Sequence, residues 1–413
     1  MGKERYMGGK GVEMSVEAPP RYRWVALSLA FSLAFIEHIL LFSYSPLIPD
    51  VVEGFGVSYA EAGAVFSICI AMLILLRIPW GVVVDKIGLR ASGTLASAFM
   101  AAGGLLRCYA PTYATFLAAN ALLGVGVAVV VLVLPRVVAR CFPPKETGFA
   151  TWLYVSGFAI GSIAALALTP IIQASLLSWR ATLAVYGWVA LVFTFIWFVL
   201  AKEPRSAGAE GGKHLLQGLK EVLGKRDTWL LTALFIFSGG CYDTYVTWLP
   251  TILEARGIPH QQAGVYASAV PIGFLFSAPL MGFISDKVGL RKPFIYGFAP
   301  VAAASIALTC VMPTEVLWAA SFVAGFATLG MFSVTMAIAA ENPHLLPYVS
   351  TAVGVISSVG NLGSFLFPMA VGYVRDVTGS FYGATLLLGA VPLLGIVVGA
   401  LTTETGWRAA GKR

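Results

Sequence analysis

The chain has 413 residues, of which 58% are hydrophobic and only 11% are charged. A soluble globular domain is about 45–50% apolar and about 25% charged, so this composition excludes an ordinary soluble protein. The net charge of +7 would suit an acidic partner such as nucleic acid, but the positions of the basic residues described below exclude that explanation. The five cysteines lack any CxxC spacing, and we expect free thiols rather than metal ligands.

Long apolar runs predict transmembrane helices. A helix needs about 20 mostly apolar residues to cross the hydrocarbon core of a bilayer. The weak ten-residue alternation typical of a membrane barrel does not occur. Twelve runs meet the helical criterion, and they are residues 24–45, 60–80, 91–109, 113–138, 148–172, 181–200, 229–253, 262–283, 293–311, 316–340, 348–373 and 382–402.

The basic residues are distributed unevenly between the two sides of these helices. When the N-terminus is placed inside, most of the 27 Lys and Arg residues fall in the inner segments. Basic residues favour the cytoplasmic side, so we expect a multi-pass protein of the cytoplasmic (inner or plasma) membrane with both termini in the cytoplasm. The excess positive charge therefore reflects topology, and we expect no nucleic-acid partner.

The two halves of the chain resemble each other at a constant offset of 201 residues. Pro49 matches Pro250, and Ala62-Gly63 matches Ala263-Gly264. A polar stretch rich in Lys, Glu and Gly separates the halves. The predicted fold class is thus an all-α integral membrane protein with twelve transmembrane helices in two pseudo-symmetric six-helix bundles. The predicted divisions are a cytoplasmic tail at 1–23, a bundle at 24–200, a cytoplasmic linker at 201–228, a second bundle at 229–402 and a cytoplasmic tail at 403–413.

A ten-residue motif occurs once in each half, as GVVVDKIGLR from Gly81 to Arg90 and as GFISDKVGLR from Gly282 to Arg291. Both copies resemble the signature G-x-x-x-D-[RK]-x-G-x-[RK] that the major facilitator superfamily carries after its second helix. The resemblance implies alternating access, with this loop as a conformational latch. We expect Gly81 to allow close approach of two helix ends. We also expect Asp85 to lie at the positive end of a neighbouring helix. The latch residues implied by the resemblance are Gly81, Asp85, Lys86, Arg90, Gly282, Asp286, Lys287 and Arg291.

Departures from the subfamily patterns bear on the substrate. Proton-coupled drug antiporters of the superfamily carry an Arg in helix 4 where this chain has Asn120, and their helix 5 motif is missing. Arg77 stands thirteen residues before the last Arg of the signature, as the anion-binding Arg of the nitrate and small-anion branches does. Gly360-Asn-Leu-Gly363 is also similar to a stretch of those branches. Their second Arg is replaced here by Ala278, so nitrate itself is not implied.

Five ionisable residues are expected at membrane depth. Glu37, His38, Arg77 and Asp243 are candidates for substrate binding or proton coupling, and Arg136 is expected to be an interfacial anchor or latch partner. A charge in hydrocarbon costs about 2.5–3.5 kcal/mol, so such residues usually face a cavity or a partner. Desolvation favours the neutral form of a carboxyl group, which suits reversible proton binding. The alternative for each residue is a structural, hydrogen-bonded role. Adjacent residues lie about 100° apart around a helix, so Glu37 and His38 are not both expected to face the cavity squarely. Tyr154, Tyr242 and Asn361 are further candidates for cavity contacts.

The sequence therefore predicts a secondary active transporter rather than an enzyme. No Walker motif is present for ATP use, and we expect no cofactor and no metal. The expected partners are a small-molecule substrate, protons and the lipid bilayer, and the expected state is a monomer. Arg77 and the missing drug motifs favour a small anion or organic acid. Proton-driven efflux of cationic or lipophilic drugs remains the alternative, because two buried acids would also suit a cation. A membrane sensor or enzyme is disfavoured, because no catalytic cluster and no large soluble segment is evident.

Overall fold

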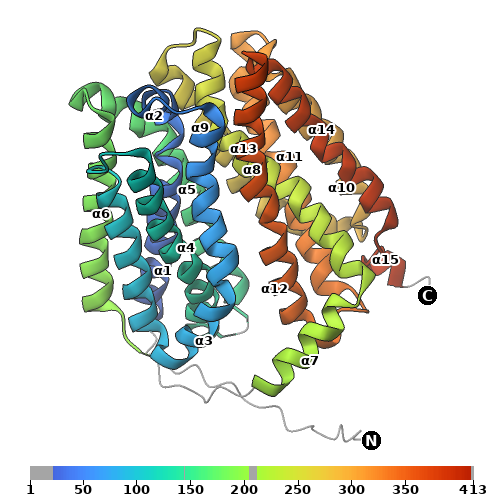
Figure 1. The fold of residues 1–413 in the computed structure, drawn as a ribbon. Coiled ribbons are helices and arrows are strands. Elements are labelled where there is room, and N and C mark those ends of the chain that lie inside the picture. Colours follow the sequence, from blue (N-terminus) through green and yellow to red (C-terminus); the bar gives the residue numbers. More distant parts are fainter. Residues whose placement is uncertain (1–21, 144, 204–211, 411–413) are drawn as a thin grey trace, which may run out of the picture.

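The structure, a computed structural model, describes residues 22–143, 145–203 and 212–410, and these are almost entirely helical (Figure 1). The predicted tail residues 1–21 and 411–413 and linker residues 204–211 lie outside this part. The helices of the first half are α1 (Tyr22–Phe42), the short 3₁₀ helix η1 (Ser45–Leu47), α2 (Ile48–Phe55), α3 (Tyr59–Leu106), α4 (Tyr113–Cys141), α5 (Thr147–Leu176) and α6 (Trp179–Leu200). Those that follow are α7 (Gly212–Leu223), α8 (Arg226–Ala255), α9 (His260–Val288), α10 (Lys292–Ala307), η2 (Leu308–Cys310), α11 (Thr314–Glu341), η3 (Leu346–Tyr348), α12 (Val349–Gly360), α13 (Leu362–Thr378), α14 (Phe381–Leu401) and α15 (Trp407–Ala410).

These elements form the twelve predicted membrane crossings, which confirms the predicted fold class. Within the described ranges, ten helical stretches are long and apolar enough to cross a membrane. One of them, α3, has 48 residues and is interrupted at Gly88, where φ is 81°, so it supplies two crossings. The remaining crossing is α8, which carries Asp227 and Asp243. The η1 and α2 segments extend the first crossing, and α12 and α13 together form the eleventh.

Local sequence signals define where several helices begin. The Ser58 side chain accepts a hydrogen bond from the Glu61 N–H, and the Glu61 carboxylate accepts one from the Ser58 N–H over 2.8 Å. Thr112 caps α4 through Thr115 in the same reciprocal way. Such caps satisfy N–H groups that have no partner within the helix. The short loops between crossings are therefore sharply defined.

The helices pack as two groups, α1 to α6 and α8 to α14, that meet along one end of the molecule (Figure 1). The main contacts between the groups are α3 with α13 and α5 with α9, which correspond under the 201-residue offset. The end that contains these contacts is called the closed end below. The opposite end, where α1 begins and α14 finishes, is called the termini end. The two groups diverge toward the termini end.

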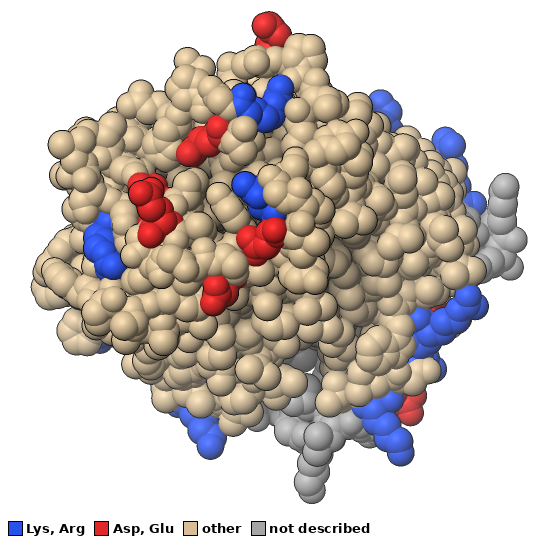
Figure 2. All heavy atoms as spheres, turned by 45° about the horizontal axis from the view of Figure 1, so that its top comes forward, with Lys and Arg blue, Asp and Glu red and all other residues tan. Residues whose placement is uncertain are grey.

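The outer faces of the helix groups are apolar. Val192 and Phe195 of α6 and Leu387 and Val397 of α14 are about 60–70% exposed. Figure 2 looks onto the closed end and shows its charged side chains over the middle of that face, with largely uncharged flanks around them. Apolar side chains exposed in a continuous belt suit contact with lipid. Helix α7 lies within the predicted linker and packs on α12, with Gly218 near Tyr348 of η3 and Thr351 of α12.

Candidate functional site

A cavity of about 340 Å³ lies between the two helix groups. Helices α1, α3, α4 and α5 line it from the first half, and α8, α9, α11 and α12 line it from the second. Its wall is mostly aliphatic and aromatic. A few polar groups converge on it, which is the usual composition of a small-molecule site. The polar lining residues are Glu37, His38, Arg77, Tyr242, Asp243, Ser357 and Asn361.

The two predicted intramembrane acids face this cavity from opposite halves. Glu37 lies on α1 and is 3% exposed, and Asp243 lies on α8. Both carboxyl groups line the same cavity. One Glu37 carboxyl oxygen is buried and has no hydrogen-bond partner among the described residues. Acidic groups from both halves of the chain thus share one cavity.

Arg77 provides a positive charge in the same cavity. It lies on α3 and is partly buried, and it forms no hydrogen bond or ion pair with any residue in the described part of the chain. A guanidinium group carries five donors in a fork that suits carboxylate, nitrate or phosphate oxygens. An unpaired guanidinium at this depth is costly unless a ligand or water binds it. Arg77 therefore has the geometry of a ligand-binding residue.

His38 also lines the cavity, beside Glu37 on α1. Its ring lies 4.6 Å from the Phe158 ring and 5.4 Å from the Phe42 ring, measured between centroids. Its Nδ1 atom is buried and has no hydrogen-bond partner within the part of the chain that the structure describes. Both adjacent residues thus reach the cavity, although the helical spacing led us to expect that only one would face it squarely. The aromatic packing of His38 suits a wall residue.

Asn361 lies at a break in the eleventh crossing. Helix α12 ends at Gly360, α13 begins at Leu362, and the Asn361 amide donates to the Ser357 carbonyl over 2.7 Å. Interrupted helices at midmembrane often supply polar groups to transporter sites.

The two tyrosine candidates differ in position. Tyr242 lines the cavity and its buried hydroxyl has no partner among the described residues. Tyr154 packs edge-on against Phe158 and is not among the lining residues. Helix α8 continues through Gly239 and Gly240 beside Asp243, and Gly240 allows close packing on Gly363.

Small residues allow the halves to touch at the closed end. A methyl group on Gly63 would collide with the Pro368 carbonyl oxygen, and one on Gly264 would collide with the Leu166 carbonyl oxygen. Gly63 and Gly264 are matched by the sequence repeat. The repeat therefore marked the residues that permit this closure, but the sequence alone did not show their role.

Three hydrogen bonds between described residues also cross between the halves at the closed end. The Asp376 carboxylate accepts from the N–H groups of Tyr59 (3.0 Å) and Ala60 (2.8 Å), which begin α3. His260, which begins α9, contacts Gln173 of α5 over 2.9 Å. Tyr59 and His260 correspond under the 201-residue offset. Sequence reasoning missed both contacts, because neither residue lies in a motif.

The first latch motif forms an exposed ion-pair network within its own half. Arg136 of α4 donates to Asp85 over 2.8 Å, and Arg140 pairs with Glu203 over 3.2 Å. Glu203 also accepts from the Arg90 N–H over 2.9 Å, beside the left-handed Gly88. The network holds the loop after the second crossing against the ends of α4 and α6.

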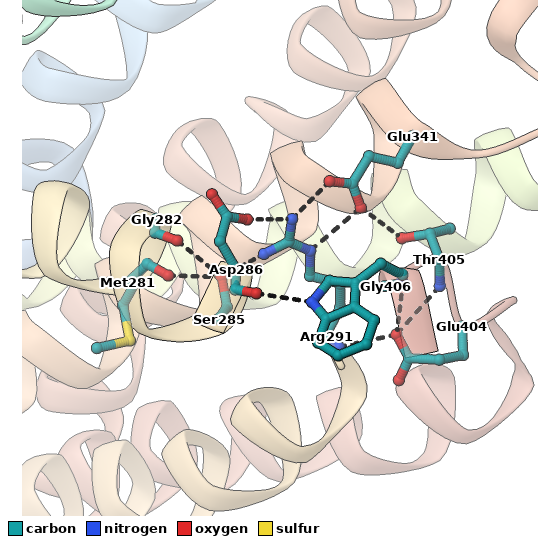
Figure 3. Close-up of polar contacts among 10 residues, drawn as sticks. Met281, Gly282, Ser285, Asp286, Arg291, Glu341, Glu404, Thr405 and Gly406 are labelled. Carbon is teal, nitrogen blue, oxygen red and sulfur yellow. Dashed lines mark hydrogen bonds and ion pairs between the residues drawn. The ribbon is translucent and has the colours of Figure 1, made fainter. Parts of the chain in front are cut away.

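The second latch is centred on one buried arginine (Figure 3). The Arg291 guanidinium binds Glu341, Asp286 and Ser285, and its Nε donates to Glu341 over 3.1 Å. The hydrogen bond to Glu341 raises the pKa of Arg291 above its usual value, and burial opposes this effect. Glu404 accepts from the Arg291 N–H over 2.8 Å. Residues after α14, predicted only as a tail, thus fold back onto the latch.

The Trp407 indole completes this arrangement. It donates to the Asp286 carbonyl over 2.9 Å and lies against Gly289, which has a φ of 71°. A side chain at Gly289 would be strained by its backbone and would collide with the indole.

Two expectations for the latch are not met in this conformation. A methyl group on Gly81 or Gly282 would meet no atom within 4 Å, so neither glycine mediates a close helix approach in this conformation. The reason is that the termini ends of the two helix groups stand apart. Asp85 pairs with the Arg136 side chain rather than with a helix end. Lys86 and Lys287 are exposed, and neither pairs with a residue in the described ranges.

The chain matches the family model of the Major Facilitator Superfamily over residues 30–368 and 251–406. It is 24% identical to the D-galactonate transporter of Escherichia coli O6:H1, over 93% of this chain and 96% of that protein. It is 24% identical to the cyanate transport protein CynX of E. coli K12, over 83% of this chain and 88% of that protein. It is also 24% identical to the probable nitrate transporter NarT of Staphylococcus carnosus, over 86% of this chain and 89% of that protein.

Solved structures share the fold. A bacterial homologue of the human lysosomal transporter Spinster, in an inward-facing and unoccupied conformation, superposes with a TM-score of 0.74 at 15% identity. The match covers 93% of this chain and 96% of that chain. Taken with the duplicated latch, the two six-helix groups and the shared cavity, these matches show that the chain is a multi-pass membrane transporter, not an enzyme, and that it belongs to the Major Facilitator Superfamily.

Proposed function

We propose that this transporter moves a small anion or organic acid together with protons across the cytoplasmic membrane by alternating access. The observation that carries the proposal is the unpaired Arg77 guanidinium in the cavity that Glu37 and Asp243 also line. One cavity then holds an anion site and two proton sites. A single chain supplies both halves of that cavity, residues 24–200 and 229–402, so a monomer suffices.

The charges explain how protons and an anion would be coupled. With both acids ionised, Glu37, Asp243 and Arg77 give the cavity one net negative charge, which repels an anion. With both acids protonated, the cavity carries the single positive charge of Arg77. Electrostatic interactions are strong in a partly desolvated site, so protonation would raise anion affinity and anion binding would raise proton affinity. This reciprocity is the basis of symport.

The asymmetric closure suggests which side the cavity faces. The halves touch at the closed end and diverge at the termini end (Figure 1). We infer from the excess of Lys and Arg in the loops of the termini end that this end lies in the cytoplasm. The conformation is then inward-facing, in which the substrate would be released into or bound from the cytoplasm.

The relatives support an anionic substrate. The proteins matched above are named for D-galactonate, cyanate and nitrate, which are all anions. The apolar and aromatic wall of the cavity suits an organic acid with a hydrocarbon portion better than it suits a bare inorganic ion.

The test is ligand-dependent thermal stability of the purified protein in detergent. Sodium salts of D-galactonate, benzoate and nitrate would be compared with chloride at pH 5 and pH 7.5. A ligand that binds the folded state raises its stability by mass action. We expect at least one anion to raise the midpoint by about 2–4 °C, more at pH 5 than at pH 7.5. Arg77→Ala should abolish this shift.

Two controls make the test specific. Arg136→Ala removes a guanidinium from the latch rather than from the cavity and should leave the anion effect intact. Glu37→Gln with Asp243→Asn should leave anion binding present but independent of pH. Stabilisation by cationic amphiphiles, lost in Glu37→Gln, would instead establish the alternative of drug efflux.

A further inference from the structure

His260 lies at the centre of a hydrogen-bonded chain that joins the two halves at the closed end. Its Nε2 is 2.9 Å from Gln173 Oε1, across the interface. Its Nδ1 is 2.8 Å from Glu254 Oε1, near the end of α8. The Gln173 amide in turn donates to Asp50 Oδ1 over 2.9 Å. The chain therefore runs from Asp50 through Gln173 and His260 to Glu254.

The donors and acceptors of this chain require an additional proton. If Asp50 is ionised, it only accepts, so the Gln173 amide nitrogen must face it and the amide oxygen must face His260. His260 then donates through Nε2. Its Nδ1 faces the Glu254 carboxylate, which also only accepts when ionised. A neutral imidazole has one N–H, so it cannot donate at both nitrogens.

Each arrangement that satisfies all three hydrogen bonds holds the same number of protons. His260 is an imidazolium, or Glu254 is protonated and donates to Nδ1. Alternatively, Asp50 is protonated and the Gln173 amide is reversed. In all three arrangements, the hydrogen-bonded chain holds one proton more than it would with a neutral His260 and with Asp50 and Glu254 both ionised. The closed contact is thus complete only when this proton is bound.

We propose that Asp50, Gln173, His260 and Glu254 form a proton-binding site that locks the closed end of the transporter. Gln173 belongs to the first half, and His260 to the second, so separating the halves breaks the contact. The closed state would bind the proton more tightly than the open state. By linkage, a lower pH on that side favours closure, and a higher pH favours opening. This site is separate from the cavity carboxyl groups.

The surrounding charges are consistent with a dedicated site. Glu254 contacts His260 directly, and Asp50 is linked to it through Gln173. Arg256, near Glu254, is turned away and donates to the carbonyl oxygens of Thr309 and Met312. The His260 side chain is 30% exposed, so the proton can exchange with solvent.

The repeat supplies an internal comparison. Tyr59 occupies the position of His260 in the first half, and its contact uses the Asp376 carboxylate and backbone N–H groups. A carboxylate that accepts two N–H bonds needs no added proton. The two closures at this end therefore differ in proton requirement, and His260 carries the dependence near neutral pH.

The experiment measures the distance across the closed end by electron spin resonance in lipid nanodiscs. Spin labels would be attached at Tyr109→Cys and Val377→Cys, which are 72% and 68% exposed and lie outside the contact. Native cysteines would be replaced by alanine. Glu37→Gln and Asp243→Asn would remove the cavity carboxyl groups, and Asp376→Asn would weaken the other closure. We expect the ratio of closed to open molecules to rise about tenfold from pH 7.5 to pH 5.5.

The decisive variant is Glu254→Gln. Its amide can donate to Nδ1 of a neutral His260, so the contact no longer needs the added proton. We expect this variant to stay closed at both pH values. Glu53→Gln, the repeat counterpart of Glu254, should retain the parent response. A Glu254→Gln chain that responds to pH like the parent would overturn the proposal. So would a parent chain that stays closed at pH 7.5, because the closure would then hold without the proton.

Discussion

The two latch loops occupy equivalent places in the two halves but use opposite charge arrangements. In the first half, the exposed acid Asp85 pairs with Arg136, whose side chain is 29% exposed. In the second half, Arg291 is only 6% exposed in its side chain, and two acids, Asp286 and Glu341, surround it. One latch is a set of solvent-exposed pairs, and the other is a single buried cation with several acceptors.

One contact of the duplicated loop is the same in both copies, although the ion pairs around it differ. Arg140 and Glu341 stand at the same repeat position with opposite charges. By contrast, Glu203 and Glu404 also correspond, and each accepts the backbone N–H of the last motif arginine, over 2.9 and 2.8 Å. Both halves thus use an acid from beyond their last helix to hold the loop. The ion pairs around that contact differ between the copies.

Among the substitutions considered, removal of the buried Arg291 guanidinium should lower the free energy of unfolding most. We expect Arg291→Ala to lower the free energy of unfolding by about 3 kcal/mol, because it leaves two facing carboxylates unpaired. The expected loss is at the low end of the range for breaking a buried ion pair, because Asp286 and Glu341 are both partly exposed to solvent. Denaturation in SDS micelles would measure the change.

Arg90→Ala is the matched variant in the first half. The Arg90 side chain donates to the Phe198 carbonyl at an exposed site, so its loss should cost about 1 kcal/mol or less. Equal losses for Arg90→Ala and Arg291→Ala would refute the distinction between the two latches.

The turn glycine of the second latch should show an intermediate effect. Gly289→Ala places a side chain at a φ of 71° and against the Trp407 indole. The backbone cost alone is about 1–2 kcal/mol, and the collision adds to it. In a Trp407→Ala chain, Gly289→Ala should cost measurably less, by the same denaturation assay. A cost that does not depend on Trp407 would show that the indole does not press on this turn.

The smallest effect is expected at the exposed pair of the first latch. Asp85→Asn should change the free energy of unfolding by about 1 kcal/mol or less, and the change should shrink as salt screens the pair. Denaturation at 50 mM and 500 mM NaCl would measure this. A salt-independent loss above about 2 kcal/mol would mean that Asp85 has a buried partner or a conformational role.

Much of the architecture was predictable because the bilayer imposes it. Every crossing must be a long apolar helix, so hydropathy alone gave the crossings that the structure contains. The predicted boundary between crossings two and three also holds, although the helix backbone is interrupted only at Gly88. Helix α7 was missed, because a short amphipathic helix in a polar linker has no membrane signature.

The cavity residues were predictable for a related reason. Glu37, Arg77 and Asp243 lie on the cavity because a charged side chain at that depth cannot face lipid. The closed-end contacts were not predictable, because they depend on how the halves meet. His260 and Gln173 are separated by 87 residues and belong to no motif. Tyr154 was suggested by its polar hydroxyl, but the rotation of α5 places its ring against Phe158.

The Asp376 contact has a consequence for the evolution of such transporters. Its partners are the backbone N–H groups of Tyr59 and Ala60, which every residue except proline can supply. The hydrogen bonds to Asp376 therefore place no demand on the side chains at positions 59 and 60, whereas the Tyr59 ring packs separately against Trp248 and Phe381. The contact at His260 is made by two side chains, and a change in one would select for a change in the other. Covariation in an alignment would therefore reveal the hydrogen bond of His260 and overlook the hydrogen bonds of Asp376.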